Sequence, residues 1–346
     1  MIPLRASYRD IPLYSPPKRP CRVDLSDNTN LFGVPPAAAR KLGEFSSEWL
    51  RRYPRSYAPD LRQVLASRLG VAAEWVTTGC GSDDVLDSAL RAFLEPGEVL
   101  AFQDPTFVMM PLFAKVNGLR TEPVPLCADF DVDPEALLAT GAKVIYLCTP
   151  NNPTGTVLSR ESVERVVERA PGIVIIDEAY ADFARGPGFL DLALTRTNVL
   201  VTRTFSKAFG LASMRVGWGV GHPRLVAEVE KARGPYKLTQ LAESMAVATL
   251  NEDLAWVRVW AAEAVANRER LREALMSMGL APLPSEGNFV LVPLPGALEV
   301  AERMRERDVN VRAFQGLTGV GDALRIGSGP WPLLETALTA LRESLR

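Results

Sequence analysis

The sequence predicts an α/β fold with a mostly parallel sheet flanked by helices, followed by a smaller α+β domain at the carboxyl end. Three observations lead to this prediction. Short apolar runs rich in β-branched residues alternate with amphipathic helical patterns. The runs are continuously apolar, as strands buried on both faces of a parallel sheet are. Near residue 240 the pattern changes to a long helical stretch.

Four apolar runs are the predicted strands of the parallel sheet. Each has the length of a buried strand and is bounded by polar or turn-forming residues. The runs are Val99–Phe102, Val144–Cys148, Ile173–Ile176 and Val199–Thr202.

Amphipathic patterns between these runs predict the flanking helices. The segment Ser159–Ala170 begins with a serine that has Glu161 close behind it, and it ends at Pro171-Gly172. From about Leu241 an Ala-, Glu- and Arg-rich helical stretch continues to Met278, and a strand is expected at 288–292. We therefore expect an amino-terminal arm over residues 1–35, a large domain over 36–240 and a small domain over 241–346.

Charge and hydropathy argue against nucleic acid and membranes as binding partners. The 39 basic and 41 acidic side chains give a formal net charge of −2, which provides no basic patch for nucleic acid or an anionic membrane. Prolines interrupt the amino-terminal segment where a secretory signal needs an apolar core, and no apolar run has the length of a membrane span. We expect a cytoplasmic protein that binds small molecules.

Cysteine and histidine counts exclude several kinds of site. The four cysteines are far apart and form no C-x-x-C pair, so they are expected to be small buried residues and not zinc ligands or disulfides. His222 is the single histidine, which excludes a Ser-His-Asp triad and a multi-histidine metal site. We expect no metal and a structural His222 in a loop.

Polar residues directly follow three of the predicted strands. The segments are Thr149–Gly155, Asp177–Tyr180 and Arg203–Lys207. Ligands bind beyond the carboxyl ends of strands in open α/β sheets, so these segments are expected to share one site.

Two residues of these segments carry distinctive chemistry. Asp177 follows an apolar strand, and a buried carboxylate stays ionised only if a cation or several donors compensate it. A protonated heteroaromatic nitrogen is such a cation. Lys207 is a candidate for a desolvated amine that forms a Schiff base, although a surface lysine is the alternative when it is taken alone.

Two further segments suggest a site for an anion. Arg215 offers a bidentate fork to a phosphate, and Thr204 and Ser206 add hydroxyl donors. The glycine-rich segment 77–84 precedes the helical pattern Val85–Phe93, so its backbone N–H groups could bind an anion. A simple Ser or Asp helix cap is the alternative there.

Taken together and in this order, the residues from about Asp24 to Ile326 resemble the fold type I pyridoxal-phosphate enzymes. The resemblance is to the class I/II aminotransferases and most closely to their histidinol-phosphate aminotransferase branch. It implies pyridoxal 5′-phosphate as the cofactor, bound by the large domain. It also implies a homodimer with shared active sites, to which residues 1–35 contribute.

The resemblance assigns the cofactor residues one by one. Lys207, Asp177 and Tyr180 are the expected catalytic residues: Lys207 holds the cofactor, Asp177 pairs with the ring nitrogen, and Tyr180 donates to the ring hydroxyl. Phe107 stacks on the ring and Asn152 contacts its hydroxyl. The phosphate is expected to be held by Gly81, Ser82, Asp83, Thr204, Ser206 and Arg215, with Tyr53 reaching it from the neighbouring subunit.

The same resemblance suggests the substrate residues. Arg325, in Leu324–Gly327, is expected to bind the substrate's α-carboxylate or the equivalent end of the substrate, and Arg312 faces the substrate as well. Asn28 lies in the matching amino-terminal segment. Tyr14 matches a tyrosine that meets a substrate phosphate, with packing of the proline-rich arm as the alternative.

The predicted activity is transfer of the amino group of L-histidinol phosphate to 2-oxoglutarate, in histidine biosynthesis. Another amino-acid aminotransferase, of aromatic or broad specificity, and a threonine-phosphate decarboxylase remain as alternatives. A non-catalytic binding module would have little need of Lys207. A Rossmann dehydrogenase would need a strand-turn-helix and a ribose-binding acid around Gly217–Gly221, and the sequence provides neither.

Overall fold

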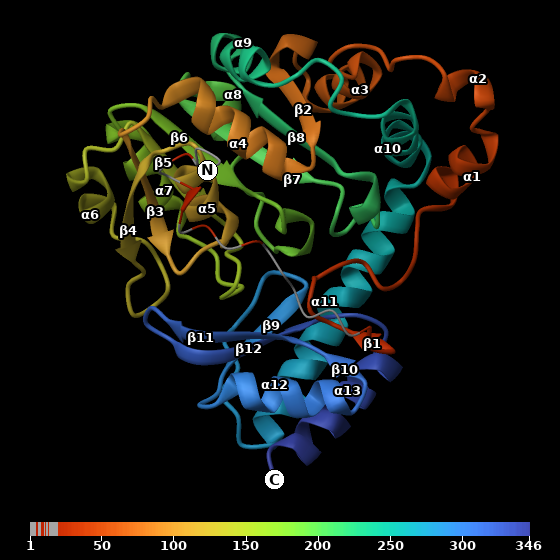
Figure 1. Cartoon of the computed structure of the whole chain (residues 1–346), viewed down its shortest axis with the longest axis vertical. Coiled ribbons are helices and arrows are strands. Elements are labelled where there is room, and N and C mark those ends of the chain that lie inside the picture. The colour runs from red at the N-terminus through yellow and green to blue at the C-terminus, as the bar shows by residue number, and fades with distance from the viewer. Residues whose placement is uncertain (1–4, 6–7, 10, 12, 14–19) are drawn as a thin grey trace, which may run out of the picture.

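A seven-stranded sheet forms the centre of the computed structural model, which describes residues 5, 8, 9, 11, 13 and 20–346 (Figure 1). Its strands are β2 (Val76–Cys80), β3 (Val99–Asp104), β4 (Arg120–Pro125), β5 (Val144–Cys148), β6 (Ile173–Asp177), β7 (Val199–Thr204) and β8 (Val216–Gly221). The order is β2-β8-β7-β6-β5-β3-β4, with β8 antiparallel to both of its neighbours and the other pairs parallel. The predicted α/β fold is confirmed.

Helices cover both faces of this sheet. On one face lie α4 (Ser82–Phe93), α5 (Met109–Val116) and α9 (Pro223–Ala232). On the other face lie α3 (Pro59–Leu69), α6 (Pro134–Ala139), α7 (Arg160–Arg169), α8 (Leu190–Thr195) and α10 (Gln240–Glu252). The helix α1 (Pro36–Glu44) packs on the outer side of α10 (Figure 1). The short helix α2 (Ser47–Leu50) follows α1 along the chain.

Burial on both faces explains the continuous apolar runs. Along β5, Val144, Tyr146 and Cys148 pack with the first group of helices, whereas Ile145 and Leu147 pack with the second. Successive side chains of a strand point to opposite faces, so every position of a central strand must be apolar. The predicted strands differ from the observed ones by at most two residues at their ends.

A second, smaller unit lies below the large sheet in Figure 1. It contains the antiparallel sheet β11-β12-β9, made of β9 (Phe289–Pro293), β11 (Arg312–Leu317) and β12 (Gly321–Gly327). It also contains α12 (Ala297–Glu306), α13 (Trp331–Ser344) and the parallel pair of β1 (Val23–Asp24) with β10 (Val309–Asn310). Residues near both ends of the chain therefore share one apolar cluster.

The long helical stretch from about 241 to 278 is two helices. After α10 the chain breaks at Asp253, whose φ of −118° and ψ of 17° are not helical, and α11 (Leu254–Ser277) follows. The Asp253 carboxylate accepts a hydrogen bond from the backbone N–H of Ala37 in the first turn of α1. The Asp253 side chain makes no cap hydrogen bond to α11, so its contact with Ala37 is the interaction that accompanies the break.

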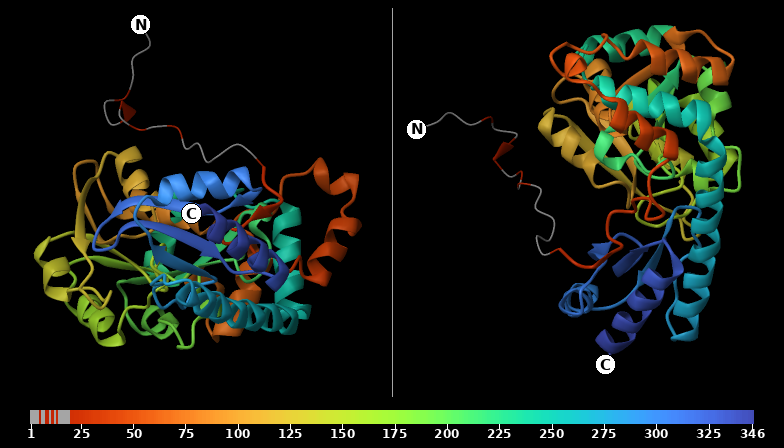
Figure 2. Two further views of the ribbon diagram at one scale, coloured as in Figure 1. Left: turned by 90° about the horizontal axis from the view of Figure 1, so that it is seen from below. Right: turned by 90° about the vertical axis from the view of Figure 1, so that its right-hand side faces the viewer.

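The packing of α10 and α11 can be compared with the predicted domain boundary at residue 240. α10 packs in the cluster of the large sheet, whereas Leu271 and Leu275 near the end of α11 pack with the small unit. Figure 2 shows α11 running along both units. The predicted boundaries stay a prediction, and we propose that the small unit begins within α11.

Two smaller expectations need correction. Cys148 is buried, but Cys127 is exposed and Cys21 and Cys80 are half-buried, so the cysteines are not uniformly buried. His222 is the N-cap of α9 and accepts from the backbone N–H of Arg224, so it ends a loop in a capping role. Within the described residues, no helix combines the length and apolar composition needed to cross a membrane.

Candidate active site

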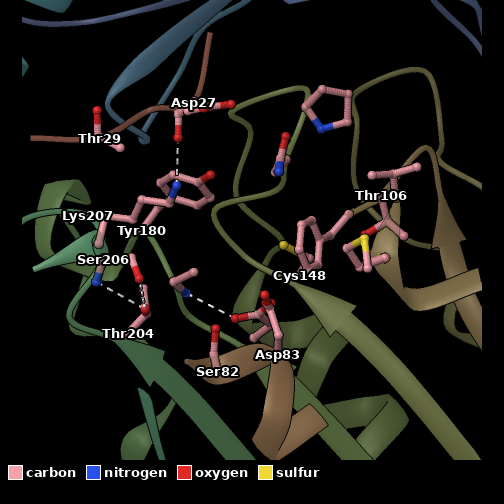
Figure 3. A pocket seen from close by; sticks show the side chains of 18 of the residues that line it. Asp27, Thr29, Ser82, Asp83, Thr106, Cys148, Tyr180, Thr204, Ser206 and Lys207 are labelled. Carbon is pink, nitrogen blue, oxygen red and sulfur yellow. Dashed lines mark hydrogen bonds between the residues drawn. The ribbon is translucent and has the colours of Figure 1, made fainter. Parts of the chain in front are cut away.

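A cavity of about 520 Å³ opens at the carboxyl ends of β5, β6 and β7, next to β11 and β12 (Figure 3). The parallel strands bring their polar following segments to one edge of the sheet, as the sequence predicts. The predicted residues that line the cavity are Ser82, Asp83, Phe107, Asn152, Asp177, Tyr180, Thr204, Ser206, Lys207, Arg215, Arg312 and Arg325.

Four predicted residues do not line the cavity. Gly81 is the N-cap of α4, directly before Ser82. Asn28 is buried behind Tyr180 and donates to its hydroxyl oxygen over 3.1 Å. Tyr53 is 85% exposed and stacks on Tyr236 with ring centroids 5.2 Å apart. Tyr14 lies outside the described residues.

Asp177 is a buried carboxylate at the end of β6 that lines the cavity. Its Oδ2 accepts from the Tyr146 hydroxyl at 2.8 Å, and its Oδ1 accepts from the Thr202 hydroxyl at 3.3 Å and from the Ala179 backbone N–H at 3.2 Å. Burial raises the pKa of Asp177 to about 6, and these donors oppose the rise. A cationic ligand group beside it would restore full ionisation.

Lys207 reaches into the cavity from the loop after β7. Its Nζ donates to the backbone carbonyl oxygen of Asp27 over 2.8 Å, as the dashed line in Figure 3 shows. Burial, followed by the positive charge of Arg325, lowers the pKa of Lys207 to about 8. About a tenth of this amine is therefore neutral and nucleophilic at pH 7, far more than of an ordinary lysine.

Tyr180 lies against Lys207 and the small unit. Burial raises the pKa of the Tyr180 phenol to about 12, so the hydroxyl stays protonated and can donate to a ligand oxygen. Its ring meets Phe289 edge-on with centroids 5.1 Å apart. Tyr180 therefore packs against β9 of the small unit as well as following β6 of the large sheet.

Small residues and donors form a cradle at the other end of the cavity. The Thr204 hydroxyl lies 3.0 Å from the Ser206 hydroxyl and also accepts from the Ser206 backbone N–H. Arg215 donates to Asp83 over 3.1 Å, in a pair that is partly exposed. The amino end of α4, where Gly81 makes no side-chain cap hydrogen bond, contributes backbone N–H groups and the positive end of the helix dipole.

Two glycines keep the cradle open. A Cβ atom on Gly217 would lie 2.0 Å from the Ser82 backbone nitrogen, and one on Gly81 would lie 2.5 Å from Nη2 of Arg215. Gly81 also has a φ of +81°, which favours glycine. The approach of β8 to the start of α4 therefore depends on glycine.

The wall from the small unit brings two arginines together. Arg312 and Arg325 are direct partners in the register of β11 and β12. Arg325 is buried, donates to Oδ1 of Asn152 over 2.6 Å and also donates to the Ser26 carbonyl oxygen. Like charges directly opposite one another on antiparallel strands are unfavourable, so an anion between them would be stabilising.

Sequence reasoning missed several residues at this site. Asp27 and Thr29 line the cavity from the amino-terminal segment, and Tyr146 and Thr202 contact Asp177 from within strands. A tyrosine within an otherwise apolar strand is a usable signal, because a buried hydroxyl needs a hydrogen-bond partner. Nothing in the local pattern marks Asp27, whose backbone carbonyl is the group that contacts Lys207.

The arrangement suits one kind of chemistry. A nucleophilic amine and a carboxylate that favours a cationic partner face the same cavity, between a phosphate-sized cradle and a pair of arginines. A phosphorylated aromatic carbonyl compound with a basic ring nitrogen could bind through Lys207, Asp177 and the cradle. A second anionic molecule could then approach from the side of Arg312 and Arg325.

Comparisons with known proteins point in the same direction. Residues 22–341 match the family model for aminotransferase class I and II. A histidinol-phosphate aminotransferase of Roseiflexus castenholzii is 37% identical over 93% of this chain and 89% of that protein. An aromatic amino acid aminotransferase of Corynebacterium efficiens is also 37% identical, over 90% of this chain and 92% of that protein.

A solved structure is similar over nearly the whole chain. It is the histidinol-phosphate aminotransferase from Sinorhizobium meliloti in complex with pyridoxal-5′-phosphate. The two share 26% sequence identity with a TM-score of 0.86, covering 95% of this chain and 92% of that one.

Proposed function

Because this chain belongs to the aminotransferase class I and II family, we propose that it transfers the amino group of L-histidinol phosphate to 2-oxoglutarate. The products would be imidazole acetol phosphate and L-glutamate, and the step belongs to histidine biosynthesis. Family membership makes the chain a pyridoxal-phosphate-dependent aminotransferase, as predicted, and not a dehydrogenase. The histidinol-phosphate aminotransferase of R. castenholzii, similar over nearly its full length, supports this choice of amino donor.

The residues of the cavity fit pyridoxal 5′-phosphate. Asp177 is a buried carboxylate whose pKa burial raises to about 6, and the protonated ring nitrogen would supply a positive charge beside it. Gly217 lets β8 pass directly against the start of α4, where any side chain would collide with the Ser82 backbone, and this close approach sets the amino end of α4 at the cradle. Asp177 and the cradle therefore line the same cavity.

The cradle would hold the phosphate. Thr204, Ser206 and Arg215 offer two hydroxyl groups and a guanidinium, and the start of α4 at Ser82 adds backbone N–H groups. Asp83 would keep Arg215 in place through their ion pair.

The ring would lie between Phe107 and the end of β6. Phe107 presents an aromatic face for stacking, and Asp177 would hold the ring nitrogen in its protonated form. Tyr180 and Asn152 would donate hydrogen bonds to the ring oxygen.

The bound cofactor supplies an aldehyde that combines with amines and a ring that withdraws the electron pair left behind when the substrate loses its α-proton. Lys207 would hold the aldehyde carbon until the incoming amine displaces it. The freed Nζ of Lys207 would then serve as the base that takes the α-proton and returns it to the cofactor carbon. Its pKa of about 8 suits an amine that must both accept and donate a proton near neutral pH.

Arg312 and Arg325 would bind the anionic end of the substrate. Their opposed positions leave two positive charges for one anion, and Arg325 is buried and therefore little screened by solvent. The 2-oxoglutarate and L-glutamate of the second half-reaction carry carboxylates that these arginines can bind. Roles for Asn28 and Tyr14 at this end stay predictions.

A second candidate activity is transamination of aromatic amino acids. The similar aminotransferase of C. efficiens supports it, with the same 37% identity as the relative from R. castenholzii. Steady-state kcat/KM values for L-histidinol phosphate, L-phenylalanine and L-tyrosine, each with 2-oxoglutarate, distinguish the two. The proposal expects L-histidinol phosphate to be preferred by at least about tenfold, about 1.4 kcal/mol of transition-state binding, and a preference for L-phenylalanine would reverse the assignment.

We also propose a homodimer with shared sites and a cytoplasmic location. Tyr53 and Tyr236 are exposed and stack on one another, and Trp49 and Leu50 are exposed a few residues before Tyr53, so these apolar side chains are available to a second copy of the chain. A subunit-mixing experiment tests whether Tyr53 acts across the interface. Tyr53→Ala and Lys207→Ala subunits, each of low activity alone, should together recover about a quarter of wild-type activity, because half of the dimers are mixed and each has one intact site. No recovery on mixing would place Tyr53 outside the partner's site.

A further inference from the structure

Tyr146 is a fully buried polar residue in the middle of β5. Its neighbours in the register of the sheet are Phe102 on β3 and Ile175 on β6, and the three belong to the same apolar cluster. A phenylalanine would fill this position equally well. The hydroxyl therefore needs an explanation other than packing, because burying it costs free energy unless it is hydrogen-bonded.

The hydroxyl of Tyr146 donates to Oδ2 of Asp177 over 2.8 Å. The two other donors to this carboxylate, from Thr202 and Ala179, both contact Oδ1 at 3.2–3.3 Å. The hydrogen bond from Tyr146 is therefore the shortest of the three, and it is the one that contacts Oδ2. A carboxylate oxygen has two acceptor sites, so Oδ2 can accept from Tyr146 and from a ligand N–H together.

The charged and titratable groups around Asp177 come from several elements. Cys148 and Tyr146 face it from β5, Asp83 from α4, and Tyr180 from the segment after β6. The negative charge of Asp83 opposes ionisation of Asp177, whereas Tyr146 is the strongest influence favouring it. Burial raises the pKa of Tyr146 well above its usual value, so its hydroxyl remains a donor at any pH the protein meets.

We propose that Tyr146 is a positioning residue that keeps the Asp177 carboxylate ionised and oriented toward the ring nitrogen of the cofactor. The inference rests on the proposed function, since it assumes that Asp177 meets that nitrogen. Tyr146 itself does not contact the cofactor. Its effect is on when Asp177 carries a negative charge and on which of its oxygens faces the cavity.

Cofactor binding without covalent attachment tests this role. The probe is 4′-deoxypyridoxine 5′-phosphate, which has the ring nitrogen and the phosphate but no aldehyde, so Lys207 does not contribute a covalent bond. Its dissociation constant is measured from pH 5 to pH 8.5 for the wild type, for Tyr146→Phe, and for the control Phe102→Leu. Phe102 is the register partner of Tyr146 in the same cluster, so the control disturbs packing without removing a polar group.

The ratio of dissociation constants, variant over wild type, carries the result, because titration of the probe itself cancels. For Tyr146→Phe the ratio should rise as the pH falls, by about eightfold between pH 8 and pH 5, the change that a pKa of Asp177 raised by about one unit produces. The control should give a ratio that does not vary with pH. A pH-independent ratio for Tyr146→Phe would overturn the proposal.

A second measurement needs no cofactor. In the cofactor-free protein, the unfolding free energy is measured as a function of pH. The pH at which ionisation of Asp177 lowers this free energy half-way should be about one unit higher in Tyr146→Phe than in the wild type, and an unchanged midpoint would also overturn the role. Failure of the cofactor assignment on which the proposed function rests gives a different result. In that case the wild type binds the probe no better than an Asp177→Asn variant does, whereas failure of the Tyr146 role alone leaves wild-type binding strong and dependent on Asp177.

Discussion

The Nζ atom of Lys207 lies 2.8 Å from the backbone carbonyl oxygen of Asp27, a residue 180 positions earlier in the chain. The amino-terminal segment therefore closes the cavity over the amine on which the chemistry depends. The same segment carries Asn28, which donates to the Tyr180 hydroxyl, and Ser26, whose carbonyl oxygen accepts from Arg325. One short stretch of chain thus contacts Lys207, Tyr180 and Arg325.

Replacing Lys207 should abolish the reaction. In Lys207→Ala the cofactor can bind through the cradle and Asp177, but no amine remains to hold it covalently or to move the α-proton. Transamination should fall below detection. Borohydride treatment should no longer link the cofactor to the protein, and the intact mass of the protein measures this. Lys143→Ala, at an exposed pair with Glu98, is the control and should behave as wild type.

Asp177→Asn should slow turnover by about 10³-fold or more, because the ring nitrogen loses its ionic partner in the transition state. Steady-state kcat is the measurement. Cofactor binding should persist in part, since the cradle is unchanged. A variant with near-wild-type kcat would contradict the role of Asp177.

The same substitution should change how stability depends on pH in the cofactor-free protein. The folded-state pKa of Asp177, about 6, lies above the usual 3.8, so the unfolded chain releases this proton first as the pH rises. Relative to Asp177→Asn, the wild type should lose about 3 kcal/mol of unfolding free energy between about pH 4 and pH 6.5. Urea unfolding across this range measures the difference, and a constant difference would argue against a buried ionised Asp177.

Capture of the cofactor by Lys207 should depend on pH. The folded-state pKa of about 8 predicts that the rate constant for covalent capture by the cofactor-free protein rises with pH to a half-maximum near 8. Arg325 is the largest electrostatic cause of the lowered pKa, so Arg325→Met should move the half-maximum upward. Stopped-flow absorbance follows the capture, and a half-maximum near that of a free lysine would contradict the account.

The cradle should not tolerate a methyl group at Gly217. A Cβ there would lie 2.0 Å from the Ser82 nitrogen and 2.2 Å from the Gly81 carbonyl carbon, so β8 or the start of α4 must move. Gly217→Ala should lose about 1–3 kcal/mol of unfolding free energy and bind the cofactor at least about tenfold more weakly. Gly43→Ala, in α1 and with nothing within 4 Å of the added atom, is the control and should leave cofactor binding unchanged without lowering the unfolding free energy.

Much of the fold could be predicted because its signals are local. Strands buried on both faces must be continuously apolar, so β3, β5, β6 and β7 are visible in the sequence. The break at Asp253 was missed because its cause is the distant N–H of Ala37, and a helical pattern shows no sign of such a contact.

For the candidate site too, residues marked by a local sequence pattern could be predicted, whereas residues that act through distant contacts could not. Residues that directly follow strands, such as Asp177 and Lys207, could be found because parallel strands bring their carboxyl ends together. Asp27 acts through its backbone, and Tyr146 acts from inside an apolar strand on a residue of the next one. Their contributions depend on three-dimensional contacts, which spacing along the chain does not encode.

A single-turnover experiment with the amino donor tests the central claim most directly. The cofactor-loaded enzyme is mixed with L-histidinol phosphate and no 2-oxo acid, and imidazole acetol phosphate is quantified per protomer. The account predicts about one equivalent, followed by one equivalent of L-glutamate when 2-oxoglutarate is added, because each site holds one amino group between the two half-reactions. Absence of the ketone product with L-histidinol phosphate, from enzyme that forms it with another amino donor, would contradict the assignment.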